Sequence, residues 1–145
     1  MIQLLAVLLL FGLDQASKRW ATAALAGGSR DLGLLSLTLV QNRGAAFGLG
    51  QNYSGLIAVM AGVFLLLGFL VLFLKSPKTA FGRWGLILLL AGAGGNLADR
   101  IRLGAVVDFI DFRFWPVFNL ADTWITCGTI LLALAFWKLE TQEGK

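Results

Sequence analysis

Five of the eight acidic residues in this chain lie within or beside apolar stretches, where a charge is costly. Two carboxylates that share one proton can hydrolyse a bond: the ionised one activates a water molecule, and the protonated one polarises a carbonyl. The chain has no histidine and one cysteine, which excludes Ser-His-Asp and Cys-His catalysis, a Cys-rich metal site and an internal disulfide. The five aspartates are Asp14, Asp99, Asp108, Asp111 and Asp122.

Asp108 and Asp122 have contrasting local sequences. Asp108 is flanked by two valines and by a Phe-Ile pair, and desolvation in such a setting raises the pKa of a carboxyl and favours its neutral form. The alternative interpretation is that Asp108 is an acidic residue in a surface turn. Asp122 follows Asn119 by three residues, which is the spacing of a capping box at a helix start. The positive end of a helix stabilises a carboxylate there, so the two acids would hold a shared proton unequally.

Other polar residues fit supporting roles. Asp14 and Lys18 are four residues apart, so they share one helix face in the favourable order and are expected to form an ion pair. Asp99 is adjacent to Arg100, and the sequence predicts an orienting pair between them. Asn96 and Arg100 are also four apart and share a face.

The composition indicates which elements position these residues. Hydrophobic residues make up 58% of the 145 residues and charged residues only 14%, against about 25% charged in soluble domains. The net charge of +4 is spread over single and paired basic residues. This spread excludes a nucleic-acid surface and suits contact with anionic lipid head groups. The chain is therefore predicted to be a membrane protein.

Four apolar segments predict an all-α membrane protein in which residues 1–145 form one domain. The second segment has twenty residues without a charge, enough to cross a hydrocarbon layer of about 30 Å. The first segment resembles the apolar part of a signal peptide, but no basic residue precedes it and Asp14 and Lys18 interrupt it, so we expect it to be retained. The predicted transmembrane helices span about 2–25, 55–74, 84–99 and 119–138.

The connections predict the remaining structure. Residues 35–41 alternate apolar and polar side chains for most of their length, which indicates a strand, and glycines follow. We expect a small β-cradle over about 32–50 at the membrane surface, and a second structured connection over 100–116. Counting four crossings places all five aspartates and the cradle on one side. Three basic residues in 75–83 favour the other side as cytoplasmic, although the aspartate side has more basic residues in total.

Five short motifs resemble those of the lipoprotein signal peptidases, or signal peptidase II, of bacterial inner membranes. Each motif alone is weak, but five in the family's order and at family-like spacing are specific, and they span nearly the whole chain. Ala98 departs from the pattern, because a larger aliphatic residue is usual there, and this affects packing rather than chemistry. The motifs are Asp14-Gln15-Ala16-Ser17-Lys18, Asn42-Arg43-Gly44-Ala45-Ala46-Phe47-Gly48, Gly95-Asn96-Leu97-Ala98-Asp99-Arg100, Val106-Val107-Asp108-Phe109-Ile110-Asp111 and Phe118-Asn119-Leu120-Ala121-Asp122.

The resemblance implies a multi-pass inner-membrane aspartic endopeptidase with four transmembrane helices and both termini cytoplasmic. It also implies a β-cradle and a short periplasmic connection on the outer face, near the active site. Asp108 and Asp122 would be the catalytic pair, without metal or cofactor. The substrates would be diacylglyceryl-modified prolipoproteins, cut just before the lipidated cysteine, and we expect a monomer in contact with membrane lipids. The implied supporting residues are Asp14, Lys18, Asn42, Asn96, Asp99, Arg100 and Asn119.

Three other functions fit parts of the sequence. A small proton-coupled transporter could use the same aspartates, although the uncharged second segment offers it no relay across the bilayer. A scaffold protein could use the small-residue surface at 91–95. A Ser/Lys peptidase would need a serine beside a lysine in space, whereas the adjacent Ser17 and Lys18 point to different helix faces.

Overall fold

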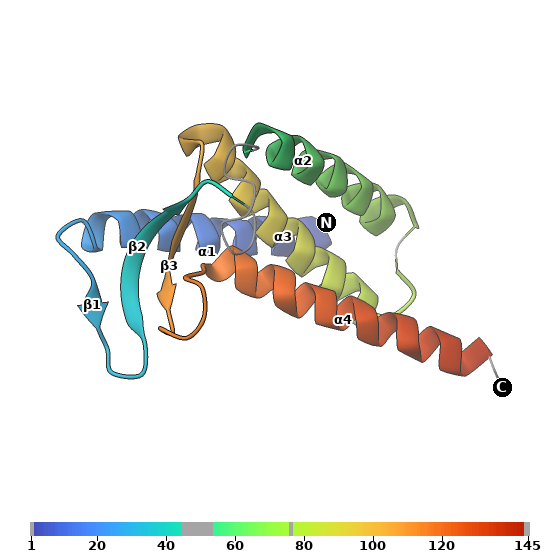
Figure 1. The fold of residues 1–145 in the computed structure, drawn as a ribbon. Coiled ribbons are helices and arrows are strands. Elements are labelled where there is room, and N and C mark those ends of the chain that lie inside the picture. The colour runs from blue at the N-terminus through green and yellow to red at the C-terminus, as the bar shows by residue number, and fades with distance from the viewer. Residues whose placement is uncertain (1, 45–53, 76, 144–145) are drawn as a thin grey trace.

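The computed structural model describes residues 2–44, 54–75 and 77–143. Over these ranges the chain forms four long helices and three short strands (Figure 1). A π-helical turn, η3, extends the second helix. In chain order the elements are α1 (Ile2–Ala24), β1 (Arg30–Asp31), β2 (Ser36–Asn42), α2 (Ser54–Leu70), η3 (Val71–Lys75), α3 (Ala80–Leu103), β3 (Val106–Asp111) and α4 (Leu120–Glu143).

Helix α3 is central, because α1, α2 and α4 all pack against it. Its close approach to both α4 and α1 depends on glycine. A Cβ atom on Gly92 would collide with the backbone oxygen of Ala121 and meet Ile125, and one on Gly95 would collide with the Asp14 carboxylate. The close backbone approach predicted for residues 91–95 is therefore present, and it places the start of α4 directly against α3.

We predict that Gly92→Ala destabilises the protein, whereas Gly94→Ala does not. The added methyl at Gly92 would force α4 away from α3, and overpacking of this kind costs about 1–3 kcal/mol. A Cβ on Gly94, two residues along the same helix, meets only a ring carbon of Phe11 at an ordinary 3.7 Å. Thermal unfolding in detergent measures both variants. Equal melting temperatures for the two would contradict this account of the helix contact.

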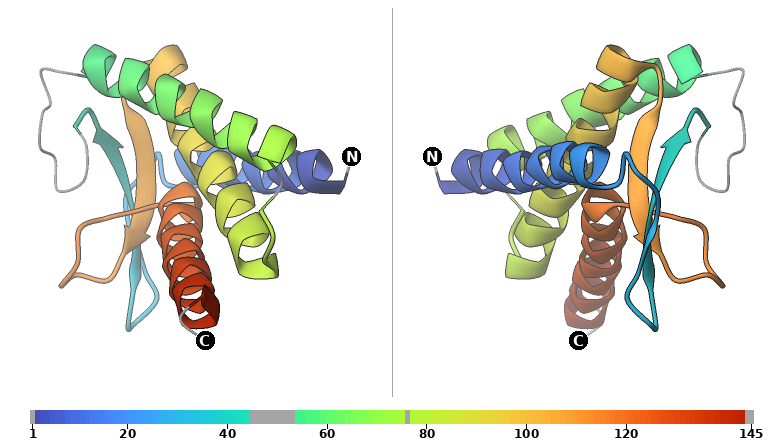
Figure 2. Two further views of the ribbon diagram at one scale, coloured as in Figure 1. Left: turned by 90° about the vertical axis from the view of Figure 1, so that its right-hand side faces the viewer. Right: turned by 90° about the vertical axis from the view of Figure 1, so that its left-hand side faces the viewer.

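The three strands form one antiparallel sheet in the order β1-β2-β3. In both views of Figure 2 the strands stand together at one side of the helices. The sheet packs on the end of α1 through a small apolar cluster in which Phe109 meets Ala21 and Leu25. In the register of β2 and β3, Val40 is opposite Asp108 and Asn42 is opposite Val106. The sheet thereby places Asp108 beside Asn119, the residue that precedes α4.

The predicted elements are largely present, but some bounds differ, and α4, predicted to end near 138, continues to Glu143. The third helix, predicted over 84–99, begins earlier, where Thr79 accepts a hydrogen bond from the Gly82 backbone N–H at 3.0 Å. The helix also ends later, at Leu103, because Arg100 and Arg102 continue it rather than end it. Gly104, with φ 70°, forms its C-terminal cap. Strand β3 lies where only a structured connection was predicted. Residues 45–50 of the predicted cradle lie outside the described residues.

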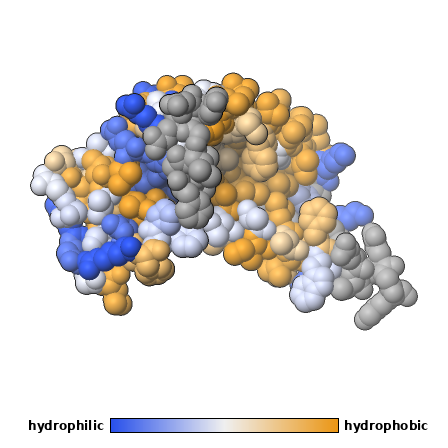
Figure 3. All heavy atoms as spheres, in the orientation of Figure 1, coloured by the Kyte–Doolittle hydropathy of each residue, from blue (hydrophilic) through white to orange (hydrophobic). Residues whose placement is uncertain are grey.

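The helices carry much of their apolar surface on the outside. Exposed leucines, valines and phenylalanines cover α2, and Figure 3 shows apolar residues over the helices while hydrophilic ones gather near the sheet. Two segments of the described chain are long and apolar enough to cross a membrane, Gly55–Lys75 and Leu120–Lys138. Helices α1 and α3 have 23 and 24 residues, so they have the length, but charged residues interrupt them.

Candidate active site

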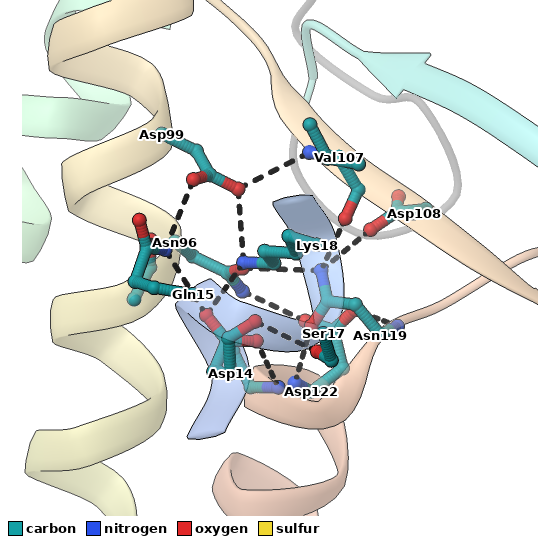
Figure 4. Close-up of polar contacts among 12 residues, drawn as sticks. Asp14, Gln15, Ser17, Lys18, Asn96, Asp99, Val107, Asp108, Asn119 and Asp122 are labelled. Carbon is teal, nitrogen blue, oxygen red and sulfur yellow. Dashed lines mark hydrogen bonds and ion pairs between the residues drawn. The ribbon is translucent and has the colours of Figure 1, made fainter. Parts of the chain in front are cut away.

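A buried ammonium group organises the polar residues between the helices (Figure 4). Lys18 Nζ lies 2.9 Å from Asp14 Oδ2, 2.9 Å from Asp99 Oδ2 and 2.9 Å from Asn96 Oδ1. These three acceptors use all three of its N–H groups. All three charged side chains are at most 3% exposed. The predicted Asp14–Lys18 ion pair is present, within a larger triad.

Asp99 does not form the predicted orienting ion pair with Arg100, although its charge still acts on that guanidinium. Adjacent residues on a helix point in different directions, and Asp99 turns inward to Lys18, Gln15 and the backbone of Val107. Arg100 instead donates to the Gly44 carbonyl at 2.8 Å and to the Asn96 carbonyl at 3.4 Å. It therefore ties the end of β2 to α3.

Two asparagine amides connect the triad to the aspartates of interest. Lys18 occupies the Asn96 Oδ1 atom, which leaves Nδ2 to donate to Asp122 Oδ1 at 2.8 Å. Asn119 is fully buried and donates to Asp108 Oδ1 at 2.6 Å, and also to Asn96 Oδ1 at 3.2 Å. The donors Lys18 and Asn119 thus set the amide orientation of Asn96, which bonds Asp122, while Asn119 itself bonds Asp108.

The start of α4 is a reciprocal capping box. The Asn119 side chain accepts from the Asp122 backbone N–H at 2.9 Å, and the Asp122 carboxylate accepts from the Asn119 backbone N–H at 3.2 Å. Asp14 adds a third cap, accepting from the Ala121 N–H at 2.9 Å. The predicted capping is confirmed. It holds the Asp122 carboxylate in the first turn of α4.

Asp108 is more deeply buried than Asp122. Its side chain is 2% exposed. Burial, and then the nearby charge of Asp122, raise the pKa of Asp108 to about 7, although hydrogen bonds from Asn42 and Asn119 act against that rise. The neutral form is therefore favoured at Asp108, as the sequence predicts. Burial and the neighbouring charge of Asp122 thus act on Asp108 to keep its proton at higher pH than an ordinary aspartate.

The raised pKa of Asp108 predicts how stability changes with pH. Because the folded-state pKa of about 7 exceeds the ordinary 3.8, the stability that neutral Asp108 contributes is complete below about pH 4 and is lost as pH rises through about 7. The melting temperature should thus fall from pH 5 to pH 8, and Asp108→Asn should make that fall smaller. The chain has no histidine to mask the effect. An unchanged fall in Asp108→Asn, with Asp111→Asn as the matched control, would contradict it.

One residue of this polar network was not predicted from the sequence, and one of the five aspartates lies away from it. Gln15 was not predicted, yet its amide donates to Asp99 at 3.0 Å and to Gly95 O at 3.2 Å; its place beside Asp14 in the first motif was the available signal. Asp111 lies at the far end of β3, where it accepts from the Arg113 backbone. Ser17 donates to the Asp14 carbonyl at 2.7 Å, and Lys18 is fully engaged elsewhere. A Ser/Lys catalytic pair is therefore not formed there.

This geometry agrees with what comparison with known proteins finds. Residues 6–138 match the family described as Signal peptidase (SPase) II. The chain belongs to the signal peptidase II family. It is similar to a lipoprotein signal peptidase of Clostridioides difficile, with 44% identity over 99% of both chains. It is also similar to one of Pelotomaculum thermopropionicum, with 48% identity over 75% of this chain and 70% of that protein.

Signal peptidase II membership makes the chain a peptidase, and solved structures support its fold. A structure described as a bacterial membrane enzyme matches with a TM-score of 0.90 and 29% identity, over 99% of this chain and 92% of that one. A second bacterial membrane enzyme matches with a TM-score of 0.78, over 93% of this chain. The predicted class, a helical membrane-type fold with a small sheet, is therefore confirmed.

Proposed function

We propose that this signal peptidase II removes signal peptides from diacylglyceryl-modified prolipoproteins, cutting just before the lipidated cysteine, with Asp108 and Asp122 as its catalytic pair. The observation that carries the catalytic assignment is Asn119. Its side chain donates to Asp108 and its backbone N–H donates to Asp122. One fully buried residue therefore hydrogen-bonds to both carboxyls. The names of the relatives, lipoprotein signal peptidases, support the substrate class.

The proposed reaction follows from the unequal environments of the two acids. Asp122, acting as the base, takes a proton from a water molecule as that water attacks the scissile carbonyl carbon. Asp108, protonated, donates its proton to the carbonyl oxygen. Collapse of the tetrahedral intermediate breaks the C–N bond, and the leaving amine takes the proton from Asp122 while the new carboxyl group returns one to Asp108. The pair ends in its starting state.

Seven residues would support the pair rather than react. Asn96 and Asn119 orient the carboxyls, and Asn42 donates to Asp108 Oδ2 at 3.2 Å from the end of β2. Lys18, with its two carboxylate partners, fixes Asn96. Arg100 lies close enough for the charges of Asp122 and Asp108 to act on it, so it suits a role in positioning substrate backbone. The supporting set is Asp14, Lys18, Asn42, Asn96, Asp99, Arg100 and Asn119.

The proposed placement has all four helices crossing a bacterial inner membrane as one domain, with both termini cytoplasmic. The apolar segments Gly55–Lys75 and Leu120–Lys138 support two of the crossings, and the lengths of α1 and α3 support the others. The sheet and the paired aspartates would lie near the outer face, where a lipidated substrate can enter from the bilayer. The enzyme would act as a monomer.

Cleavage of a purified prolipoprotein, with and without prior diacylglyceryl transfer to its cysteine, tests this function. We expect cleavage of the lipidated form only, with the new N-terminus at the modified cysteine, as read by mass spectrometry. Equal cleavage of both forms would contradict the substrate assignment. Proton-coupled flux in vesicles without any cleavage would favour the transporter instead.

A further inference from the structure

A cavity of about 270 Å³ lies between α1, α3 and β3, apart from the proposed catalytic pair. Lys18 and Asp99 form its inner wall, while Asp108, Asp122 and Asn119 do not line it. Arg19 and Thr22 enter from α1, and Arg102 enters from α3. The cavity is therefore built by the outer ends of two helices, behind the buried triad.

The hydrogen-bonding groups left free in this cavity are mostly cationic donors. Lys18 has all three N–H groups engaged, and both oxygens of Asp99 already accept hydrogen bonds. Gln15 is engaged by its amide nitrogen and by its oxygen, which accepts from Arg102 Nη1 at 3.1 Å. The Arg19 guanidinium makes no hydrogen bond or ion pair with any described residue, and Arg102 retains further N–H groups. A ligand here must accept hydrogen bonds.

The charge balance in the cavity also favours an anion. Lys18 neutralises one of the two carboxylates of Asp14 and Asp99. The two guanidinium groups, of Arg19 and Arg102, exceed the remaining negative charge by one. A guanidinium group binds phosphate oxygens with two parallel hydrogen bonds. A phosphate is larger than a carboxylate and has more acceptor oxygens, so it suits two arginines better.

We propose that this cavity binds a phosphate group, either of an anionic glycerophospholipid or of a soluble phosphate ester. The rest of the wall favours an amphiphile. Ala23, Leu103 and Val107 line it, and Leu103 is 53% exposed, so an apolar surface continues outward from the charged part. The site lies at the helix ends, where the head groups of a bilayer would be. Occupancy would brace α1 against α3 directly behind Lys18.

Thermal unfolding of the full chain in nanodiscs tests the proposal. Phosphatidylglycerol, added to phosphatidylcholine discs, should raise the melting temperature of the wild type by several degrees. Arg19→Gln and the double variant Arg19→Gln/Arg102→Gln should lose at least half of that gain. Arg83→Gln, an exposed arginine at the other end of α3, should keep it. Arg19→Gln alone keeps the test valid if the double variant folds poorly, because Arg19 bonds no described residue.

A second series of melting measurements distinguishes a lipid phosphate from a soluble one. Glycerol 3-phosphate or inorganic phosphate added to phosphatidylcholine discs should give no gain if the ligand is a lipid, and an Arg19-dependent gain if it is soluble. A gain that is equal in wild type and both Arg19 variants would overturn the proposal. So would an equal loss in Arg83→Gln, since that would indicate a general effect of charge, and so would the absence of any phosphate-dependent gain.

Discussion

Asp108→Asn and Asp122→Asn are each expected to reduce signal-peptide removal by at least about 10²–10⁴-fold, the range for loss of a general acid or base. Asparagine keeps the size of the side chain, so the hydrogen bonds to Asn119 and the start of α4 can largely persist. It cannot take a proton from water or donate one as an acid does. Both variants should still accumulate in membranes, and a single-turnover assay on a lipidated prolipoprotein measures the loss.

The matched control for this pair is Asp111→Asn. Asp111 lies on the same strand as Asp108, three residues along, but it accepts from Thr38 and the Arg113 backbone instead of facing Asn119. We expect this variant to cleave at a rate close to wild type. Normal cleavage by Asp108→Asn or Asp122→Asn would remove that residue from the catalytic pair.

Lys18→Met should destabilise the protein by about 3–5 kcal/mol, the usual cost of removing one partner from a buried ion pair. The methionine would fill most of the space but leave Asp14 and Asp99 buried without a cation, and Asn96 Oδ1 would keep only its longer hydrogen bond, from Asn119. Because the Asn96 amide would then be held less firmly toward Asp122, activity should fall as well. Thermal unfolding and the cleavage assay measure the two effects.

Arg19→Met is the matched control for stability. Arg19 is adjacent in sequence and also basic, but it is exposed and bonds no described residue, so its loss should change the melting temperature little in phosphatidylcholine discs. Equal melting temperatures for Lys18→Met and Arg19→Met would show that the triad does not hold the helices together.

The helices could be predicted from the sequence because apolar composition and length decide them. Their ends were harder: the third helix was predicted to stop near Asp99, whereas Arg102 still belongs to it. Arginine ends an apolar pattern without ending a helix, since it has good helix propensity and its long side chain reaches outward. Strand β3 was missed because its pairing with β2 joins residues far apart in the sequence.

The sequence predicted which polar residues lie close together better than it predicted how they pair. The environments of Asp108 and Asp122 could be inferred from their neighbours, because desolvation and capping are local effects. The partner of Asp99 could not, since Lys18 and Asp99 meet only when α1 packs on α3. The role of Asn119 in holding both carboxyls likewise depends on the tertiary fold. Local chemistry is readable from sequence, while the choice of partner is set by packing.

The pH dependence of kcat/KM for a lipidated prolipoprotein tests most directly whether Asp108 and Asp122 act as acid and base on one proton. This parameter reports the ionisations of the free enzyme. Because the proposed mechanism needs Asp108 protonated and the pKa of Asp108 is raised to about 7, we predict that kcat/KM falls as pH rises through about 7, with the same profile in Asp111→Asn. A value that stays constant, or rises, between pH 6 and pH 9 would contradict the shared-proton mechanism.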